Sequence, residues 1–331
     1  MKSGTETLRK CAPMLLRVQR YNIFLTLQAL LGIFLYLRIM FVATIGFFDG
    51  VHCGHRYLIS RVKAEAARVG LRSMVVTMDR HPKKVVDTDY VPQLLTTTEE
   101  RIALLQGTGV DRVEVMHFDR EMSMMSARDF MRLVLHDRYD VSTLIMGYDH
   151  RFGHGGGTRE DYIRWGEECG IRVVMAPQLT GTYASSSVIR RMLQAGDVSD
   201  AARLLGHPYM LTGTVENGHK IGRTLGFPTA NLHISQEKLI PANGVYAVET
   251  TIGRGIMNIG RRPTLDNGSD LSIEVHILDY AGDLYGQTIQ LQFLGHIREE
   301  KKFASLEELK EHIRQDIDAA LKIFAATDKD M

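Results

Sequence analysis

The sequence predicts two domains of different class: a parallel α/β sheet over residues 41–195, and a small antiparallel β-barrel, closed by one helix, over residues 206–325. In the first stretch, short apolar runs alternate with amphipathic runs, which is typical of parallel strands joined by crossover helices. In the second, runs rich in Val, Ile, Thr and Tyr are separated by glycine turns, as in an all-β barrel. The length of 331 residues allows two domains of about 150 residues each.

The strands expected in the first domain are FVATIG (41–46), RSMVVTM (72–78), RVEVMHF (112–118), STLIMGYD (142–149) and RVVMAP (172–177). Between the first two, residues 55–70 place apolar side chains on one helical face. Thr97 and Glu100 form the capping-box pattern that begins another helix. Strands that alternate with helices in this way favour a single parallel sheet.

The strands of the second domain are expected within YMLTGTVENG, GVYAVETTIG, LSIEVHILDY and QTIQLQFLGHI. A helix should follow, because Ser305 and Glu308 form a capping box and apolar residues then recur at helical spacing up to Phe324. Residues 196–205 offer a short helical connector between the two domains.

The first 40 residues differ from the rest in pattern. They are rich in basic residues, and the run from Ile23 to Leu37 is apolar. That run is shorter than the usual transmembrane span of about 20 residues, and no small-residue cleavage site of a signal peptide follows it. We interpret residues 1–40 as an extension that arises from the choice of start site, with Met40 as the true start. A membrane anchor is the alternative interpretation.

Composition narrows the class of protein. A net charge of +1 argues against a protein that coats nucleic acid by charge alone. The three cysteines, Cys11, Cys53 and Cys169, show neither disulfide nor zinc spacing, which favours a reducing cytoplasm. No nucleic-acid or membrane partner is expected, and the sequence leaves a homo-oligomer open.

Glycines and histidines gather in ATIGFFDGVHCGHRYL (43–58), where the first strand should turn into a helix. The glycines, which let the backbone turn sharply and approach a ligand closely, are Gly46, Gly50 and Gly54. His52 and His55 lie on one side of the first helical turn, and each can donate to a phosphate oxygen without a permanent charge. A helix N-terminus at the carboxyl end of a parallel strand favours phosphate, so this stretch predicts a polyphosphate site.

Other residues are expected to converge on the same ligand. Asp49 could orient a histidine or help to place Mg²⁺. Asp149, at the end of a predicted strand, could accept a hydrogen bond or hold a metal ion. Ser186, Ser187 and Arg190 begin a later helix, where hydroxyl groups and a guanidinium can meet phosphate oxygens.

A second candidate site begins in GTVENGHKIGRTLGFPTANL (213–232), a glycine-rich crossing in a β context. Thr229 and Asn231 are two residues apart, so both side chains face the same side of an extended strand. Neutral oxygen ligands beside a glycine loop suit a Mg²⁺–nucleotide complex, in which the phosphates supply the remaining ligands. Glu274, in a later strand, is the residue we expect to act as general base.

These motifs together resemble one known family. GFFDGVHCGH (46–55) is similar to the nucleotidyltransferase signature with a His-x-Gly-His core, in the form found in prokaryotic bifunctional riboflavin kinase/FAD synthetases. GYDHRFGHGGG (147–157) and SSSVIRRML (185–193) resemble two further blocks of that family, and residues 213–232 resemble its riboflavin kinase signature. The resemblance extends over residues 41–325.

The resemblance implies a Rossmann-like FMN adenylyltransferase domain, which makes FAD and pyrophosphate from FMN and ATP. It also implies a riboflavin kinase barrel, which makes FMN from riboflavin and ATP, and Mg²⁺ as the cofactor. The implied catalytic residues are His52, His55 and Glu274, with Thr229 and Asn231 as metal ligands. Nucleotide or phosphate contacts are implied for Gly46, Phe48, Asp49, Gly50, Gly54, Asp149, Ser186, Ser187, Arg190, Gly218, Lys220, Gly222 and Arg223.

Flavin contacts are implied for Arg298 and Phe303, although Arg298 could instead be a structural ion-pair partner. Two positions depart from the family pattern: Phe47, where the family often has Asn, and Ser187, which stands in place of a threonine. Two alternatives stay open. The first domain could adenylylate another phosphate ester, because the His-x-Gly-His core does not specify the acceptor. The chain could also be a flavin sensor, although the intact motifs at both sites argue against this.

Overall fold

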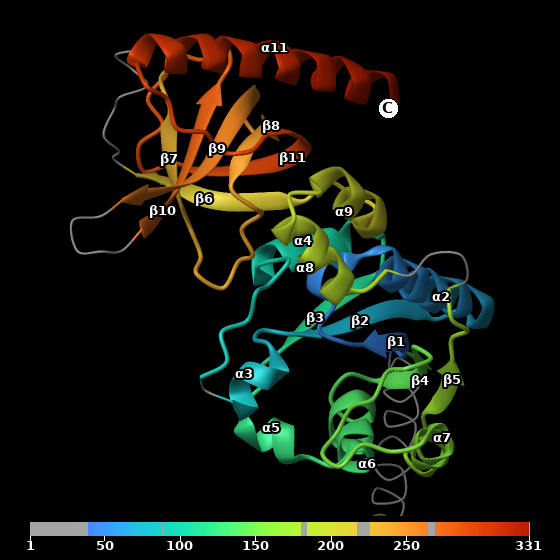
Figure 1. The fold of residues 1–331 in the computed structure, drawn as a ribbon. Coiled ribbons are helices and arrows are strands. Elements are labelled where there is room, and N and C mark those ends of the chain that lie inside the picture. The colour runs from blue at the N-terminus through green and yellow to red at the C-terminus, as the bar shows by residue number, and fades with distance from the viewer. Residues whose placement is uncertain (1–38, 88, 180–183, 217–225, 264–268, 331) are drawn as a thin grey trace, which may run out of the picture.

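The structure is a computed structural model that describes residues 39–87, 89–179, 184–216, 226–263 and 269–330. The interpretation of residues 1–40 therefore lies outside the described residues, apart from the last two positions of that stretch. Figure 1 shows a sheet domain, a barrel and a short helical region between them. Among the described residues, no helix is both long enough and apolar enough to cross a membrane.

The sheet domain contains a parallel sheet of five strands in the order β3-β2-β1-β4-β5. The strands are β1 (Phe41–Ile45), β2 (Arg72–Met78), β3 (Arg112–Met116), β4 (Val141–Met146) and β5 (Arg172–Met175). All five residues of β1 are buried, as expected for the central strand of a sheet covered on both faces. The predicted parallel α/β sheet is confirmed.

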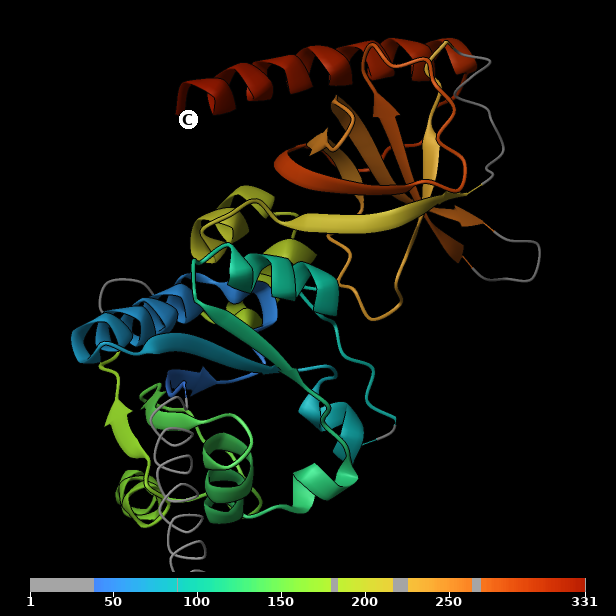
Figure 2. The same cartoon turned by 180° about the vertical axis from the view of Figure 1, so that it is seen from behind.

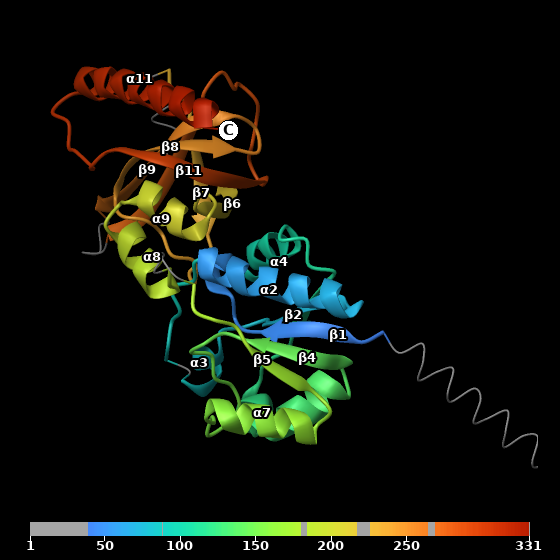
Figure 3. The same ribbon diagram turned by 90° about the vertical axis from the view of Figure 1, so that its right-hand side faces the viewer.

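Helices cover both faces of this sheet. Those of the sheet domain are η1 (Asp49–Val51), α2 (Cys53–Val69), α3 (Pro82–Val86), α4 (Thr98–Gln106), α5 (Arg120–Met124), α6 (Ala127–Asp129), the π-helix η2 (Phe130–His136) and α7 (Arg159–Glu168). α2 and α4 lie on one face, and α6 and α7 lie on the other (Figures 1 and 3). Successive β1 residues serve the two faces: Ala43 packs in a cluster with Met131 and Tyr162, while Val42 packs with Val62.

Two short helices, α8 (Ser186–Gln194) and α9 (Val198–Leu205), lead from the sheet domain to the barrel. Their apolar residues Ile189, Leu193 and Leu205 belong to the same core cluster as barrel residues such as Tyr209 and Leu211. The two domains therefore share part of one hydrophobic core.

The second domain is a closed antiparallel barrel with the strand order β10-β7-β6-β11-β8-β9. Its strands are β6 (Met210–Glu216), β7 (Ala230–Ile234), β8 (Gly244–Thr250), β9 (Arg254–Pro263), β10 (Ser269–Ile277) and β11 (Thr288–Arg298). The long helix α11 (Leu306–Asp330) lies across the end of the barrel that faces away from the sheet domain (Figures 1 and 2). The predicted barrel and closing helix are confirmed.

Candidate active sites

A cavity of about 670 Å³ opens at the carboxyl ends of β1 and β4. Its walls come from residues 45–49 after β1, the first turns of α2, residues 147–151 after β4, and the start of α8 with Arg190. This is the edge at which open parallel sheets bind ligands. The cavity therefore lies where the glycine–histidine motif predicts a site.

The turn after β1 requires unusual backbone angles and close packing. Phe48 is buried and has a φ of 57°, and Gly50 has a φ of 81°. A Cβ atom on Gly50 would lie 2.8 Å from Cδ1 of Leu95, and one on Gly46 would lie 3.1 Å from the Phe48 ring. Gly50 is thus needed for the shape of the turn, which presents the following residues to the cavity, and a side chain at Gly46 would displace the Phe48 ring.

His52 and His55 form a stacked pair at the start of α2. Their ring centroids lie 3.6 Å apart with the planes at 17°, and Nδ1 of His52 accepts a hydrogen bond of 3.4 Å from the His55 N–H. That bond leaves the proton of neutral His52 on Nε2. Burial lowers the pKa of His52 to about 4. Burial, followed by the charges of His52 and His150, holds the pKa of His55 well below its ordinary value. Both rings are therefore neutral hydrogen-bond donors at pH 7.

His150 is a third histidine of the cavity, and the sequence analysis did not select it. It follows Asp149 in the loop after β4, and both residues line the cavity. Burial lowers the pKa of His150. The Nδ1 atoms of His150 and His55 are buried and have no hydrogen-bond partner among the described residues. Buried donors or acceptors without a partner are costly, so each of these two atoms calls for a partner such as a ligand or a water molecule.

Asp49 organises one wall of the cavity. Its buried carboxylate accepts hydrogen bonds from the N–H groups of Leu95 (2.9 Å) and Thr96 (3.0 Å), from the Thr96 hydroxyl (3.1 Å), and from Arg190 (2.5 Å). Nε of Arg190 donates to the carbonyl oxygen of Gln93 at 2.7 Å. The sequence suggested that Asp49 orients a histidine or helps to place Mg²⁺. In the structure its carboxylate instead binds Arg190 and the N–H groups of residues 95 and 96.

The serines at the start of α8 divide into two groups. Ser185 caps the helix by accepting a hydrogen bond from the Val188 N–H (3.3 Å), and the Ser186 hydroxyl donates to the Asp49 carbonyl oxygen (3.0 Å). Both line the cavity. Ser187 is exposed and is not one of the residues that line it. The geometry thus favours Ser185, which sequence reasoning missed, over Ser187.

Phe47, which departs from the family pattern, contributes an aromatic wall. The Arg101 guanidinium lies 4.2 Å from its ring centroid, and His81 meets its ring edge-on at 4.8 Å. Phe47 and His81 line the cavity, whereas Arg101 is fully buried behind them. Sequence reasoning also missed His81, whose only local signal is its place directly before a proline at the start of α3.

The second candidate site lies on the barrel, where β7 pairs with β10. Asn231 is directly opposite Glu274 in the register. The Thr229 hydroxyl, one residue before β7, donates to Oε2 of Glu274 at 3.1 Å, and the Ser272 hydroxyl donates to Oε1 at 3.0 Å. The spacing of two in each strand thus gathers Thr229, Asn231, Ser272 and Glu274 on one surface. Ser272 was not selected from the sequence.

These oxygen donors are of the type that binds Mg²⁺, since a hydroxyl, an amide and a carboxylate are all hard ligands. Among the described residues, no group of three His, Cys, Asp or Glu side chains could hold a metal ion by itself. A Mg²⁺ ion here would need phosphate oxygens as further ligands. The predicted nucleotide contacts Gly218, Lys220, Gly222 and Arg223 lie outside the described residues.

Arg298 forms a two-point ion pair with Asp316 of α11. Its Nε and Nη2 donate to the two carboxylate oxygens at 2.8 and 2.7 Å, and Nη1 donates to the carbonyl oxygen of Glu299 at 3.0 Å. The guanidinium lies 5.5 Å from the centroid of the Phe303 ring. This geometry is that of the ion-pair alternative, and the flavin contacts of Arg298 and Phe303 stay predictions.

Comparison with known proteins assigns a family to each domain. Residues 38–188 match the family model of FAD synthetase, and residues 205–324 match that of riboflavin kinase. The bifunctional riboflavin kinase/FMN adenylyltransferase of Escherichia coli K12 is 38% identical over 296 residues, which cover 86% of this chain and 93% of the relative. The protein of the same name from Bacillus subtilis is 35% identical over 301 residues, with 86% and 92% covered.

A solved structure has a similar fold. It is described as a macrolide-efflux protein from Streptococcus pneumoniae, and it aligns with a TM-score of 0.76 and 29% sequence identity. The alignment covers 85% of this chain and 94% of that chain, so it includes both domains.

Proposed function

The chain belongs to the family of bifunctional riboflavin kinases/FMN adenylyltransferases, and from this membership we propose that its two sites divide the two reactions between them. The chain phosphorylates riboflavin to FMN with ATP, and it adenylylates FMN to FAD with a second ATP. We assign the adenylyl transfer to the cavity of the sheet domain. We assign the phosphoryl transfer to the Thr229–Glu274 surface of the barrel.

The stacked pair His52 and His55 is the observation that carries the first assignment. In this reaction a phosphate oxygen of FMN attacks the α-phosphorus of ATP, the bond from that phosphorus to the bridging oxygen breaks, and pyrophosphate leaves. No side-chain nucleophile is needed. The two neutral imidazoles donate to the phosphate oxygens as charge develops on them, together with the N–H groups at the start of α2.

Arg190 supplies a permanent positive charge at the wall of this site. Its hydrogen bonds to Asp49 and to the Gln93 carbonyl fix the guanidinium at the cavity wall, where it binds phosphate oxygens. Asp49 acts through Arg190 and so is a positioning residue. We assign Ser185, Ser186 and His150 as further phosphate contacts, and Asp149 as an acceptor for a hydrogen bond from the nucleotide, because all four line the cavity.

The hydrogen bond between Thr229 and Glu274 carries the second assignment. Glu274 accepts the proton of the terminal ribityl hydroxyl while that oxygen attacks the γ-phosphorus of ATP and ADP leaves. Thr229 and Asn231 hold Mg²⁺ together with the nucleotide phosphates, which the hard oxygen donors of this surface suit. The metal ion would neutralise charge on the transferred phosphoryl group.

We further propose that both reactions take place in the cytoplasm. Cys53 and Cys169 are free cysteines, as expected in a reducing compartment, and both reactions consume ATP.

A product assay with two variants tests the division of labour. His55→Ala should convert riboflavin to FMN and stop there. Glu274→Ala should fail to convert riboflavin but should still convert added FMN to FAD. Chromatography of the flavins after incubation with ATP and Mg²⁺ measures both steps. FAD formed by His55→Ala at the wild-type rate, or FMN formed by Glu274→Ala at the wild-type rate, would contradict the corresponding assignment.

A further inference from the structure

The barrel contacts the sheet domain at residues 94 and 95, beside the hydrogen-bond donors of Asp49. The segment that follows β7 runs alongside Leu94 as a short parallel bridge between Leu94 and Lys238. The Leu94 N–H donates to the Glu237 carbonyl oxygen at 2.7 Å, and the Leu239 N–H donates to the Leu94 carbonyl oxygen at 2.8 Å. Leu94 is thus hydrogen-bonded to the kinase domain, and the two residues that follow it, Leu95 and Thr96, donate hydrogen bonds to Asp49.

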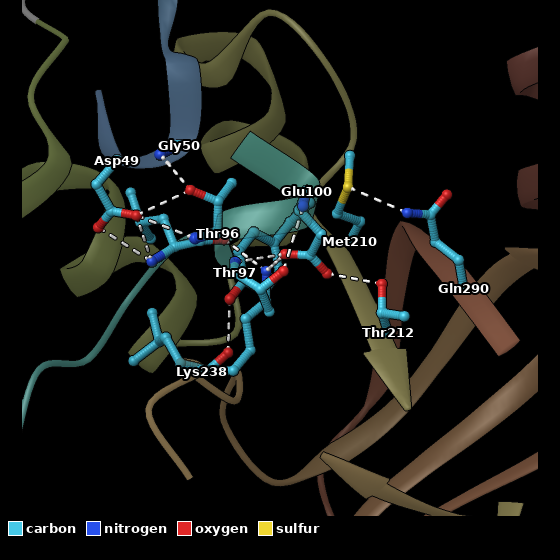
Figure 4. Close-up of polar contacts among 12 residues, drawn as sticks. Asp49, Gly50, Thr96, Thr97, Glu100, Met210, Thr212, Lys238 and Gln290 are labelled. Atoms are coloured by element: carbon cyan, nitrogen blue, oxygen red, sulfur yellow. Dashed lines mark hydrogen bonds and ion pairs between the residues drawn. The ribbon is translucent and has the colours of Figure 1, made fainter. Parts of the chain in front are cut away.

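The Lys238 side chain crosses this contact and ends in the sheet domain (Figure 4). It is 0% exposed, and its Nζ atom donates to Oε2 of Glu100 at 2.5 Å and to the carbonyl oxygen of Leu95 at 2.6 Å. The other oxygen of Glu100 accepts a hydrogen bond of 2.8 Å from the hydroxyl of Thr212, which lies on β6. Two barrel residues, Lys238 and Thr212, therefore bind the carboxylate of Glu100 in the sheet domain.

Leu95 connects this ion pair to the active site. Its carbonyl oxygen accepts from Lys238, and its N–H donates to the Asp49 carboxylate. The next residue, Thr96, gives Asp49 two more hydrogen bonds and accepts one of 3.1 Å from the Gly50 N–H (Figure 4). Asp49 in turn holds Arg190 at the cavity wall. Lys238 is thus connected to Asp49 through one intervening residue, Leu95, which is hydrogen-bonded to both.

A buried ammonium group is costly unless its charge is paired, and such a pair adds little stability compared with apolar side chains. What it supplies is a fixed geometry, because Nζ can keep its partners only when residues 95 and 100 stay in place. The neighbouring residue Glu237 lacks such a buried ion pair. Glu237 also forms an interdomain ion pair, with Lys84, but both side chains are well exposed.

We propose that Lys238 of the riboflavin kinase domain is a positioning residue for FMN adenylylation, which it supports by fixing the segment that orients Asp49 and Arg190. The inference rests on the assignment of adenylyl transfer to the sheet-domain cavity. The FAD synthetase site is then completed by the barrel, although no barrel residue lines the described cavity.

The test uses the full chain with Lys238→Met, and Glu237→Gln as the matched control. In Lys238→Met, the KM for ATP in FAD synthesis should rise about 10-fold, because the segment that orients Asp49 and Arg190 is no longer fixed, while riboflavin phosphorylation changes less than 2-fold. Glu237→Gln should change neither reaction. The double variant Lys238→Met/Glu100→Gln removes both buried charges, so it should regain thermal stability without regaining the wild-type KM.

A double-mutant cycle with Arg190→Ala separates positioning from general damage. If Lys238 acts through Arg190, the double variant should be little worse than Arg190→Ala alone, whereas independent effects would multiply. Multiplying losses, a parallel fall in both reactions, or a wild-type KM in Lys238→Met/Glu100→Gln would overturn the inference. A wild-type chain that makes no FAD would instead contradict the proposed function, and the inference would fall with it.

Discussion

The cavity of the sheet domain collects side chains from segments far apart in the sequence, whereas the barrel site takes its polar residues from two paired strands. Arg190 reaches Asp49 over 141 positions of sequence, and the carboxylate between them is buried. On the barrel, Thr229 and Glu274 meet because β7 and β10 are neighbours in register. The first site therefore depends on tertiary packing and on buried groups, and the second depends on strand alternation.

The charges differ as well. The first site combines neutral, desolvated histidines with Arg190, which is paired with Asp49, whereas the second presents a carboxylate that accepts hydrogen bonds from two hydroxyl groups. Adenylyl transfer needs donors for developing negative charge, and phosphoryl transfer to a hydroxyl needs a base. The first site thus offers hydrogen-bond donors and the second offers a base. We therefore expect that changes to one site leave the other reaction intact.

The largest effect is expected from Asp49→Asn. An asparagine has one acceptor oxygen in place of two, and its NH₂ group would face the N–H donors of residues 95 and 96. Arg190 would lose its ionic partner, so FMN adenylylation should fall about 100- to 1000-fold, as when a preorganised donor is removed. Steady-state rates of FAD formation measure the loss, and riboflavin phosphorylation should change less than 2-fold.

Asp111→Asn is the matched control, since Asp111 also accepts hydrogen bonds from a backbone N–H and a hydroxyl, both of Ser73, away from the cavity. It should leave both reactions near the wild-type rate. An equal loss of FAD synthesis in both variants would mean that Asp49 matters only for folding.

The next largest effect is expected from acidification, which should destabilise the sheet domain. The pKa of His52 is about 4 in the folded state and 6.5 in the unfolded state, so only the unfolded chain takes up a proton between these values. The stability that this difference provides is fully present above pH 6.5 and is lost as the pH falls toward 4. For His52 alone the loss is about 3 kcal/mol.

Trp165 offers the probe for this experiment, because it is the single tryptophan of the chain and lies in α7 of the sheet domain. Denaturant unfolding followed by its fluorescence at several pH values gives the free energy of unfolding of that domain. His52→Asn, which keeps a helix-capping side chain, should make the dependence between pH 6.5 and 4 less steep, while His55 and His150, whose pKa values are also lowered, keep their share of it. A slope unchanged in this variant would show that other groups cause the acid sensitivity.

A smaller effect is expected from Thr229→Val on the barrel. The change keeps the shape of the side chain but removes the hydroxyl that donates to Glu274. Riboflavin phosphorylation should fall about 10- to 100-fold, since hydrogen bonds to charged groups are worth about 1.5–3 kcal/mol. Thr229→Ser, which keeps the hydroxyl, should stay near the wild-type rate, and FAD formation from added FMN should be the same in both. A full rate in Thr229→Val would exclude the hydroxyl from the reaction.

The parts that the sequence predicted are those that local periodicity determines. Alternating runs predicted the parallel sheet and the barrel, and both are present. Spacings of three in a helix and two in a strand indicated that His52 lies beside His55, and that Thr229 and Asn231 share one side. Those relations need only the geometry of a single element.

Contacts between distant segments could not be derived in this way. The pairing of Arg190 with Asp49 and the reach of Lys238 to Leu95, over 143 positions, depend on how whole elements pack. A lysine in a polar loop also gives no sign that its ammonium group will be buried. Ser185 was missed because the choice among three adjacent serines depends on the helix boundary, which sequence patterns fix only to within a few residues.

The smallest effect is expected from His150→Phe, for which FAD synthesis and the free energy of unfolding are measured together. The His150 Nδ1 atom is buried without a partner among the described residues, which costs stability. His150→Phe fills similar space without that polar atom. FAD synthesis should fall about 10-fold, while the free energy of unfolding reported by Trp165 should stay the same or rise.

His154→Phe is the control, since His154 belongs to the same loop but is exposed and does not line the cavity. It should change neither quantity appreciably. If His150→Phe lowered stability and activity together, the imidazole would be a packing residue of the loop. If it lowered activity alone, the site would hold an unpaired polar group in readiness for its ligand, which the barrel site, with its carboxylate already paired to two hydroxyls, does not need to do.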